Sequence, residues 1–154
     1  MSNEQSVTRD IAAEPTRVWA VLTDLDSAAE TLSGVKHVEI LTEGPFRIGT
    51  RWRETRAAMG SDETFEMEVT ELEALGFARI EATSEEARSV STFKLEALHP
   101  GTRLTMTASG EPTDEAGTLK KLAAKIVAPV VGNRALRSTL ETEIEEIARA
   151  AEAK

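Results

Sequence analysis

Hydrophobic and polar residues alternate through the middle of the chain, which indicates β-structure. Phe65, Met67 and Val69 alternate with threonine and glutamate, and the same two-residue period recurs from Ser91 and from Arg103. The segments between these runs are short and turn-like, which favours an antiparallel meander with one apolar face. Six strands are expected, over residues 35–42, 50–59, 64–72, 77–83, 90–97 and 103–109.

The N-terminal part predicts a further strand and two short helices. Residues 6–12 alternate like a strand, and Pro15 suits the first turn of a helix. We expect Trp19, on the apolar face of this helix, to be mostly buried where the helix meets the sheet. Residues 27–30 read Ser-Ala-Ala-Glu, the spacing of a capping box, so a second helix is expected to begin there and to end at Gly34.

The last third of the chain predicts one long helix. Apolar residues recur at three- and four-residue steps from Leu119 to Ile147, and Pro129 followed by Gly132 predicts a kink or a break. Among the expected elements, this helix alone is long enough to cover the apolar face of the sheet. The expected fold class is therefore α+β: a curved antiparallel sheet of about seven strands, with the long C-terminal helix packed across it.

Length and charge narrow the classes of function. The 154 residues fit a single domain over 1–154, and the net charge of 18 − 27 = −9 repels phosphate backbones and anionic lipid heads. We therefore expect no nucleic-acid partner. We also expect no membrane insertion, because the chain has no run of about 18 apolar residues. With no charged-then-apolar leader at its N-terminus, the protein is expected to be cytoplasmic.

Several residue types that carry chemistry are missing. The chain has no cysteine and no tyrosine, and its two histidines stand apart, His37 at the start of a strand and His99 in a turn. We therefore expect no metal site. Neither a Walker-type glycine loop nor a dinucleotide-binding glycine motif occurs, so no cofactor is expected.

Three segments carry a resemblance to a known family: residues 11–24 (IAAEPTRVWAVLTD), residues 49–53 (GTRWR) and residues 119–137, with their internal proline and glycine. Together with the order of elements, they resemble the START-like superfamily, whose architecture is called the helix-grip fold. Within it, the chain is most similar to the polyketide cyclase/dehydrase branch of small bacterial proteins. The resemblance implies an apolar cavity between the sheet and the long helix. Members carry lipids or hormones, cyclise or dehydrate polyketides, or act as co-chaperones, and the fold alone does not choose among these roles.

Trp52, Glu54 and Arg56 share one side of an expected strand, opposite Arg51 and Arg53. If Trp52 faces the cavity, Glu54 and Arg56 also point inward, and they are the candidates for catalysis. A buried carboxylate acts as an acid or base, whereas beside an arginine it stays ionised. The alternative is that these charges lie in water at the rim of the sheet, as charged side chains usually do.

The remaining candidates are apolar, with one amide. Asn133 interrupts the apolar stripe of the last helix, where it either contacts a ligand or binds backbone groups freed by Pro129. The charged residues farther along that helix, Glu141, Glu143, Glu145, Glu146 and Arg149, are expected to be solvated. The other ligand-binding candidates line either a cavity or an ordinary core: Phe65, Met67, Phe93, Met106, Ile126 and Val130.

Three functions follow from these observations. The first is non-catalytic binding of a small hydrophobic or amphipathic molecule between the sheet and the C-terminal helix, by a monomer or a homodimer. The second is an enzyme of the cyclase or dehydratase type that uses an inward carboxylate such as Glu54 for proton transfer. The third is binding of a client protein in an apolar groove, as a co-chaperone does.

Overall fold

The described part of the chain contains seven strands, which form one antiparallel sheet in the order β1-β7-β6-β5-β4-β3-β2. The computed structural model describes residues 3–58, 61–84, 87–112 and 118–153, with side chains except at 3, 57–58, 61, 87, 111–112 and 118–133. The strands are β1 (Asn3–Ile11), β2 (Val35–Ile40), β3 (Arg51–Ala58), β4 (Ser61–Glu73), β5 (Phe77–Thr83), β6 (Ala87–Ala97) and β7 (Thr102–Pro112).

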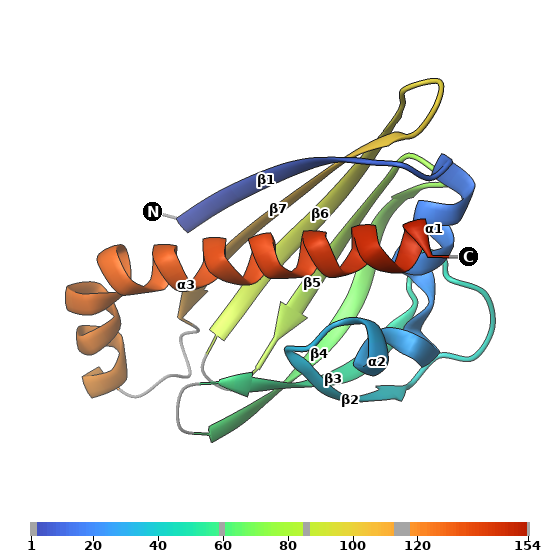
Figure 1. Cartoon of the computed structure of the whole chain (residues 1–154). Coiled ribbons are helices and arrows are strands. Elements are labelled where there is room, and N and C mark those ends of the chain that lie inside the picture. Colours follow the sequence, from blue (N-terminus) through green and yellow to red (C-terminus); the bar gives the residue numbers. More distant parts are fainter. Residues whose placement is uncertain (1–2, 59–60, 85–86, 113–117, 154) are drawn as a thin grey trace.

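The helices lie on one face of this sheet, as Figure 1 shows. They are α1 (Pro15–Thr23), a 3₁₀ turn η1 (Leu25–Ser27), α2 (Ala28–Thr31) and α3 (Thr118–Glu152). Helix α3 runs across the concave face and packs chiefly against β1 and β7, while α1 and α2 lie beside its C-terminal half. This is the α+β, helix-grip arrangement that the sequence predicts. No helix in the described ranges is long and apolar enough to cross a membrane.

The helices differ from the sequence-based expectations at α2, whereas the change of direction expected in α3 is present. The side chain of Ser27 forms no cap hydrogen bond, and η1 precedes α2, so the predicted capping box does not form and α2 ends at Thr31 rather than at Gly34. Pro129 and Gly132 lie inside α3, which continues through them. Figure 1 shows a change of direction among the orange N-terminal turns of this helix, so the backbone bends without breaking.

The apolar core divides into two clusters, because α3 covers only one half of the sheet. Beneath the helix, Leu140, Ile144 and Ile147 pack onto the inner faces of β1, β6 and β7. The second cluster lies under β3, β4 and β5 and centres on Trp52 and Val69. Between the two clusters, the inner face of the sheet faces the segment that joins α1 to α2.

Polar contacts hold α1 to the C-terminal end of α3. Arg17 donates hydrogen bonds to the carbonyl oxygens of Ala150, at 3.0 Å, and of Ala151, at 3.4 Å. At the start of α1, the carboxylate of Glu152 accepts a hydrogen bond from the amide of Ala12 at 2.9 Å. The exposed carbonyls at a helix end need such partners. These bonds fix α1, and therefore the segment that follows it, above the sheet.

Trp19 packs edge-to-face on Phe93, with ring centroids 5.8 Å apart and an interplanar angle of 69°. Most of this residue is buried, as expected, although its ring lies at the margin of the larger core cluster and is not fully enclosed. The contact joins α1 to β6, an interior strand of the sheet.

We predict that Trp19→Ala lowers the free energy of unfolding by about 2–4 kcal/mol, since a partly buried tryptophan contributes less than a fully buried one. Urea denaturation measures the change, with Thr16→Ala, at an exposed position in the same helix, as the control. A loss below about 1 kcal/mol would mean that the Trp19–Phe93 contact is not a structural anchor.

Candidate functional site

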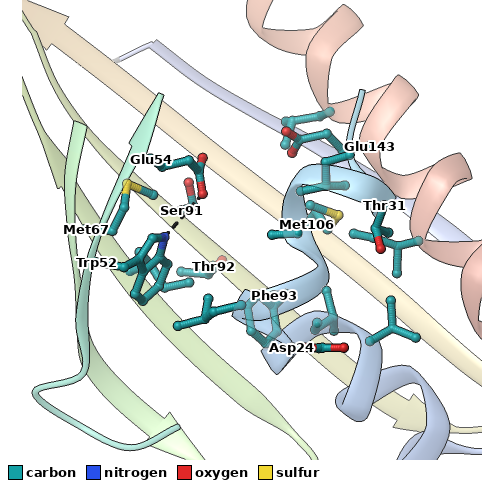
Figure 2. Close-up of a pocket in the computed structure, with 18 of the residues that line it drawn as sticks. Asp24, Thr31, Trp52, Glu54, Met67, Ser91, Thr92, Phe93, Met106 and Glu143 are labelled. Atoms are coloured by element: carbon teal, nitrogen blue, oxygen red, sulfur yellow. Dashed lines mark hydrogen bonds between the residues drawn. The ribbon is translucent and has the colours of Figure 1, made fainter. Parts of the chain in front are cut away.

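A pocket of about 120 Å³ lies between the two core clusters (Figure 2). Strands β3 to β7 form its floor, α3 closes one side, and the α1–α2 segment closes another. Because α3 packs chiefly on β1 and β7, the side chains described for its C-terminal half leave space above β3 and β4. Most of the wall is apolar, and includes Leu22, Leu25, Leu32, Trp52, Met67, Ile80, Phe93, Met106, Leu140 and Ile147.

Strand β3 turns Trp52, Glu54 and Arg56 toward this pocket and Arg51 and Arg53 toward solvent. Trp52 is 3% exposed, and its indole N–H donates to Oε1 of Glu54 at 3.2 Å (Figure 2). Glu54 is 5% exposed. Of the two alternatives that the sequence leaves open for these residues, the structure shows the inward orientation.

Arg56 joins two buried carboxylates from distant parts of the chain. Its Nε donates to Oε2 of Glu54 at 2.5 Å, and its Nη1 donates to Oε1 of Glu143 at 2.5 Å. Glu143 lies on α3, so the guanidinium links strand β3 to the helix across the edge of the pocket. Buried charges are tolerated when they are paired in this way.

Burial raises the pKa of Glu143, and the adjacent Arg56 opposes this effect without cancelling it. For Arg56, burial favours the neutral form, but the two carboxylates outweigh burial and raise its pKa, so the guanidinium stays charged. A second oxygen of Glu143, Oε2, accepts no hydrogen bond from any described residue. It is therefore available to a molecule in the pocket.

Most of the predicted site residues come together. Trp52, Glu54, Met67, Phe93 and Met106 line the pocket, as does the catalytic candidate Arg56. That they bind a ligand or act in catalysis stays a prediction. Phe65 is not in the pocket wall, because it packs against the cluster around Trp52. Ile126, Val130 and Asn133 fall in the part of α3 whose side chains lie outside the described residues.

Glu143 is the main residue that the sequence analysis misjudged. It was expected to be solvated, but it is 8% exposed and faces the pocket. Its position held the signal: it follows Leu140 by three residues and precedes Ile147 by four, on the apolar stripe. The neighbouring Glu145 and Glu146 are not buried but do have partners, Arg9 and the Ser33 amide respectively. Glu141 and Arg149 are exposed as expected.

The α1–α2 segment supplies wall residues that the sequence did not single out. Leu22, Leu25 and Leu32 cover the pocket, and the exposed Asp24 adds a carboxylate to its wall (Figure 2). Helical spacing places Leu22 and Leu25 on the apolar face of the first helix, but only the path of the chain above the sheet brings them to the pocket. His37 and His99 are both exposed and lie outside the pocket wall. No group of three or more described histidine or carboxylate side chains is placed to hold a metal ion.

Comparison with known proteins bears on both the fold and the family. The model of the family described as "Polyketide cyclase / dehydrase and lipid transport" matches residues 4–152. No curated protein matches the chain.

Three solved structures illustrate the similarity in fold. The aromatase/cyclase Zhui from Streptomyces sp. R1128 aligns with a TM-score of 0.76 at 19% identity, over 99% of this chain and 94% of that one. Protein TTHA0849 from Thermus thermophilus gives 0.73 at 24% identity, over 97% and 99%. Protein CV1439 from Chromobacterium violaceum gives 0.72 at 19% identity, over 99% of both chains. At these identities, the similarity shows the shared fold and no shared activity.

The first prediction from the site concerns Arg56. Arg56→Met leaves two buried carboxylates without their cation and should cost about 3–5 kcal/mol of stability at neutral pH. Arg53→Met on the solvent side of the same strand, where Arg53 pairs with exposed Glu39 at 3.2 Å, is the matched control and should cost at most about 1 kcal/mol. Equal losses in urea denaturation would show that the buried link contributes no more than a surface pair.

The second prediction concerns the effect of Glu143 on the pH dependence of stability. Because burial raises its pKa above the ordinary value of 4.5, the folded state binds this proton more tightly than the unfolded state does. The resulting stabilisation is complete below pH 4.5 and is lost as pH rises through the folded-state pKa. We therefore predict that wild type loses stability relative to Glu143→Gln over that interval.

Urea denaturation of both proteins from below pH 4.5 to neutrality measures this difference. Exposed Glu141→Gln, on the same helix, is the control and should track wild type at every pH. An advantage of wild type over Glu143→Gln that grows with pH would reverse the predicted sign.

Proposed function

This chain belongs to the polyketide cyclase/dehydrase and lipid transport family, and from that premise we propose that it binds a small hydrophobic or amphipathic molecule in the pocket beside α3. The observation that carries the proposal is the composition of the pocket wall. Leucine, methionine and aromatic side chains form most of it, and a few polar groups cluster along one side. Binding sites for small molecules have this combination of an apolar body and a few placed polar groups.

The contacts of the polar side chains support binding rather than proton transfer by Glu54. Both of its carboxylate oxygens are occupied, one by the Trp52 indole and the other by Arg56. Neither oxygen of Glu54 is therefore left without a partner to meet a bound molecule. Glu54 therefore suits a role in fixing the orientation of Trp52 and Arg56.

A cyclase or dehydratase activity is the second candidate. The observation in its favour is that Glu143, also in the pocket wall, has a raised pKa and an oxygen with no donor among the described residues, as a general acid requires. The chemistry would then depend on the helix carboxylate rather than on Glu54.

Native mass spectrometry of freshly purified protein tests both candidates. A copurified small molecule is identified, removed and then added back in excess over the protein. A binding protein returns the molecule unchanged, and Glu54→Gln and Glu143→Gln do not alter that result. Conversion of the molecule that is lost in Glu143→Gln would favour the enzyme.

We predict that Ser91→Phe abolishes uptake of a neutral single-ring probe, phenethyl alcohol, because Ser91 lines the pocket and a phenyl group there fills it. Lys94→Phe adds the same ring at an exposed position of the same strand and should bind like wild type. Circular dichroism confirms that both variants fold, and titration calorimetry measures uptake. Undiminished binding by folded Ser91→Phe would place the site elsewhere.

A further inference from the structure

The charged groups in the pocket wall are unbalanced. Among the described lining residues, Arg56 is the only cation, against the carboxylates of Asp24, Glu54 and Glu143. With all three ionised, their sum is 1 − 3 = −2, inside a chain whose net charge is −9. Such a wall attracts cations and repels anions, and the two buried carboxylates, Glu54 and Glu143, contribute more to this preference than the exposed Asp24 does.

Arg56 does not offset this preference, because its charge is already engaged. Two carboxylates accept its hydrogen bonds at 2.5 Å each. An anionic ligand would have to displace one of these carboxylates and would leave that carboxylate buried without a partner, which is costly.

Glu143, in contrast, has an unused acceptor. Its side chain is nine-tenths buried and lines the pocket, and its Oε2 has no hydrogen-bond donor among the described residues. Buried acceptors normally have a hydrogen-bond donor as partner, so a ligand that donates a hydrogen bond to this oxygen would be stabilised in the pocket. The Trp52 and Phe93 rings in the same wall add surfaces that favour a cation near an aromatic face.

Size limits the apolar part of the ligand. An enclosed cavity of about 150 Å³ lined by aliphatic and aromatic side chains binds benzene, and the pocket here has a similar volume of about 120 Å³ and is partly open to solvent. One ring therefore fits within the apolar part of the pocket, between Met67, Phe93 and Met106.

We infer that the pocket selects a cationic amphiphile: a protonated amine, which donates to Glu143, attached to an apolar body about the size of one ring. The inference rests on the proposed function and adds the chemical class of the ligand to it. Neutral analogues bind more weakly, because they gain a hydrogen bond without the charge, and anionic analogues bind most weakly.

Three probes of nearly equal size test the charge preference: phenethylamine, phenethyl alcohol and phenylacetate. Titration calorimetry at neutral pH and low salt gives the affinities, and the NMR shift of the Trp52 indole N–H reports binding in this pocket. Trp19→Phe identifies which of the two indole signals belongs to Trp52. We expect the amine to bind about tenfold more tightly than the alcohol, a difference of about 1.4 kcal/mol, and the carboxylate to bind least.

Glu143→Gln should reduce the ratio of amine to alcohol affinity, measured within the same variant, from about tenfold to about twofold or less. Glu141→Gln makes the same change of charge at an exposed position of α3 and should keep the wild-type order. If Glu143→Gln does not fold, Asp24→Asn reduces the negative charge of the wall from the other side and should narrow the preference in the same direction.

The possible outcomes distinguish the inferred ligand class from the proposed binding function. If the alcohol binds and the amine binds no more tightly, or if phenylacetate binds best, the inferred ligand class is wrong and the binding function stands. If none of the three probes shifts the Trp52 indole signal, the single-ring site and the proposed function both fail. An amine preference that survives unchanged in folded Glu143→Gln would also overturn the role assigned to Glu143.

Discussion

The guanidinium of Arg56 is the contact on which the site depends, because it joins the two halves of the molecule that the pocket separates. Backbone hydrogen bonds hold the strands together and apolar packing holds α3 to β1 and β7, whereas β3 lies on the far side of the pocket from the helix. Arg56 connects the two through Glu143 on one side and Glu54 on the other. A largely buried ion pair of this kind is a weak source of net stability, yet it fixes geometry, since its two carboxylates have little access to water.

The same contact explains how an apolar pocket tolerates charged side chains. Trp52 lies deep in the wall because its indole N–H has Glu54 as acceptor, and Glu54 is tolerated there because Arg56 compensates its charge. Each polar atom in this series of bonds depends on its neighbour, so the removal of one member affects all of them. Both oxygens of Glu54 and Oε1 of Glu143 accept hydrogen bonds in this series, whereas Oε2 of Glu143 has no donor among the described residues. A hydrogen-bond donor of a ligand therefore has a partner on the α3 side of the pocket.

The sequence predicts the fold well because the fold follows from local patterns. Alternation placed the strands within a few residues, and Pro15 marked the start of α1. The two-residue spacing also predicts that Trp52, Glu54 and Arg56 share one side of a strand. It leaves open whether that side faces the pocket or solvent. Local patterns do not show which residue pairs with a given charge. Glu143 has the sequence surroundings of a surface residue of α3, and its partner, Arg56, lies 87 positions away in the sequence. The Ser27 cap failed for a similar reason, because the chain crossing the sheet imposes a 3₁₀ turn first.

The pairing of β1 with β7 has a consequence for how the protein is made. Asn3 to Ile11 pair with Gly110 to Thr102, so β1 finds its neighbour only after about a hundred further residues exist. Contacts of such long sequence separation slow folding. During synthesis, β2 to β6 can pair as they emerge. Strand β1 stays unpaired, with one apolar face, until β7 has been synthesised. Helix α3 follows all of the strands and needs β1 and β7 already side by side, because it packs on both. The pocket is therefore completed only when α3 has left the ribosome.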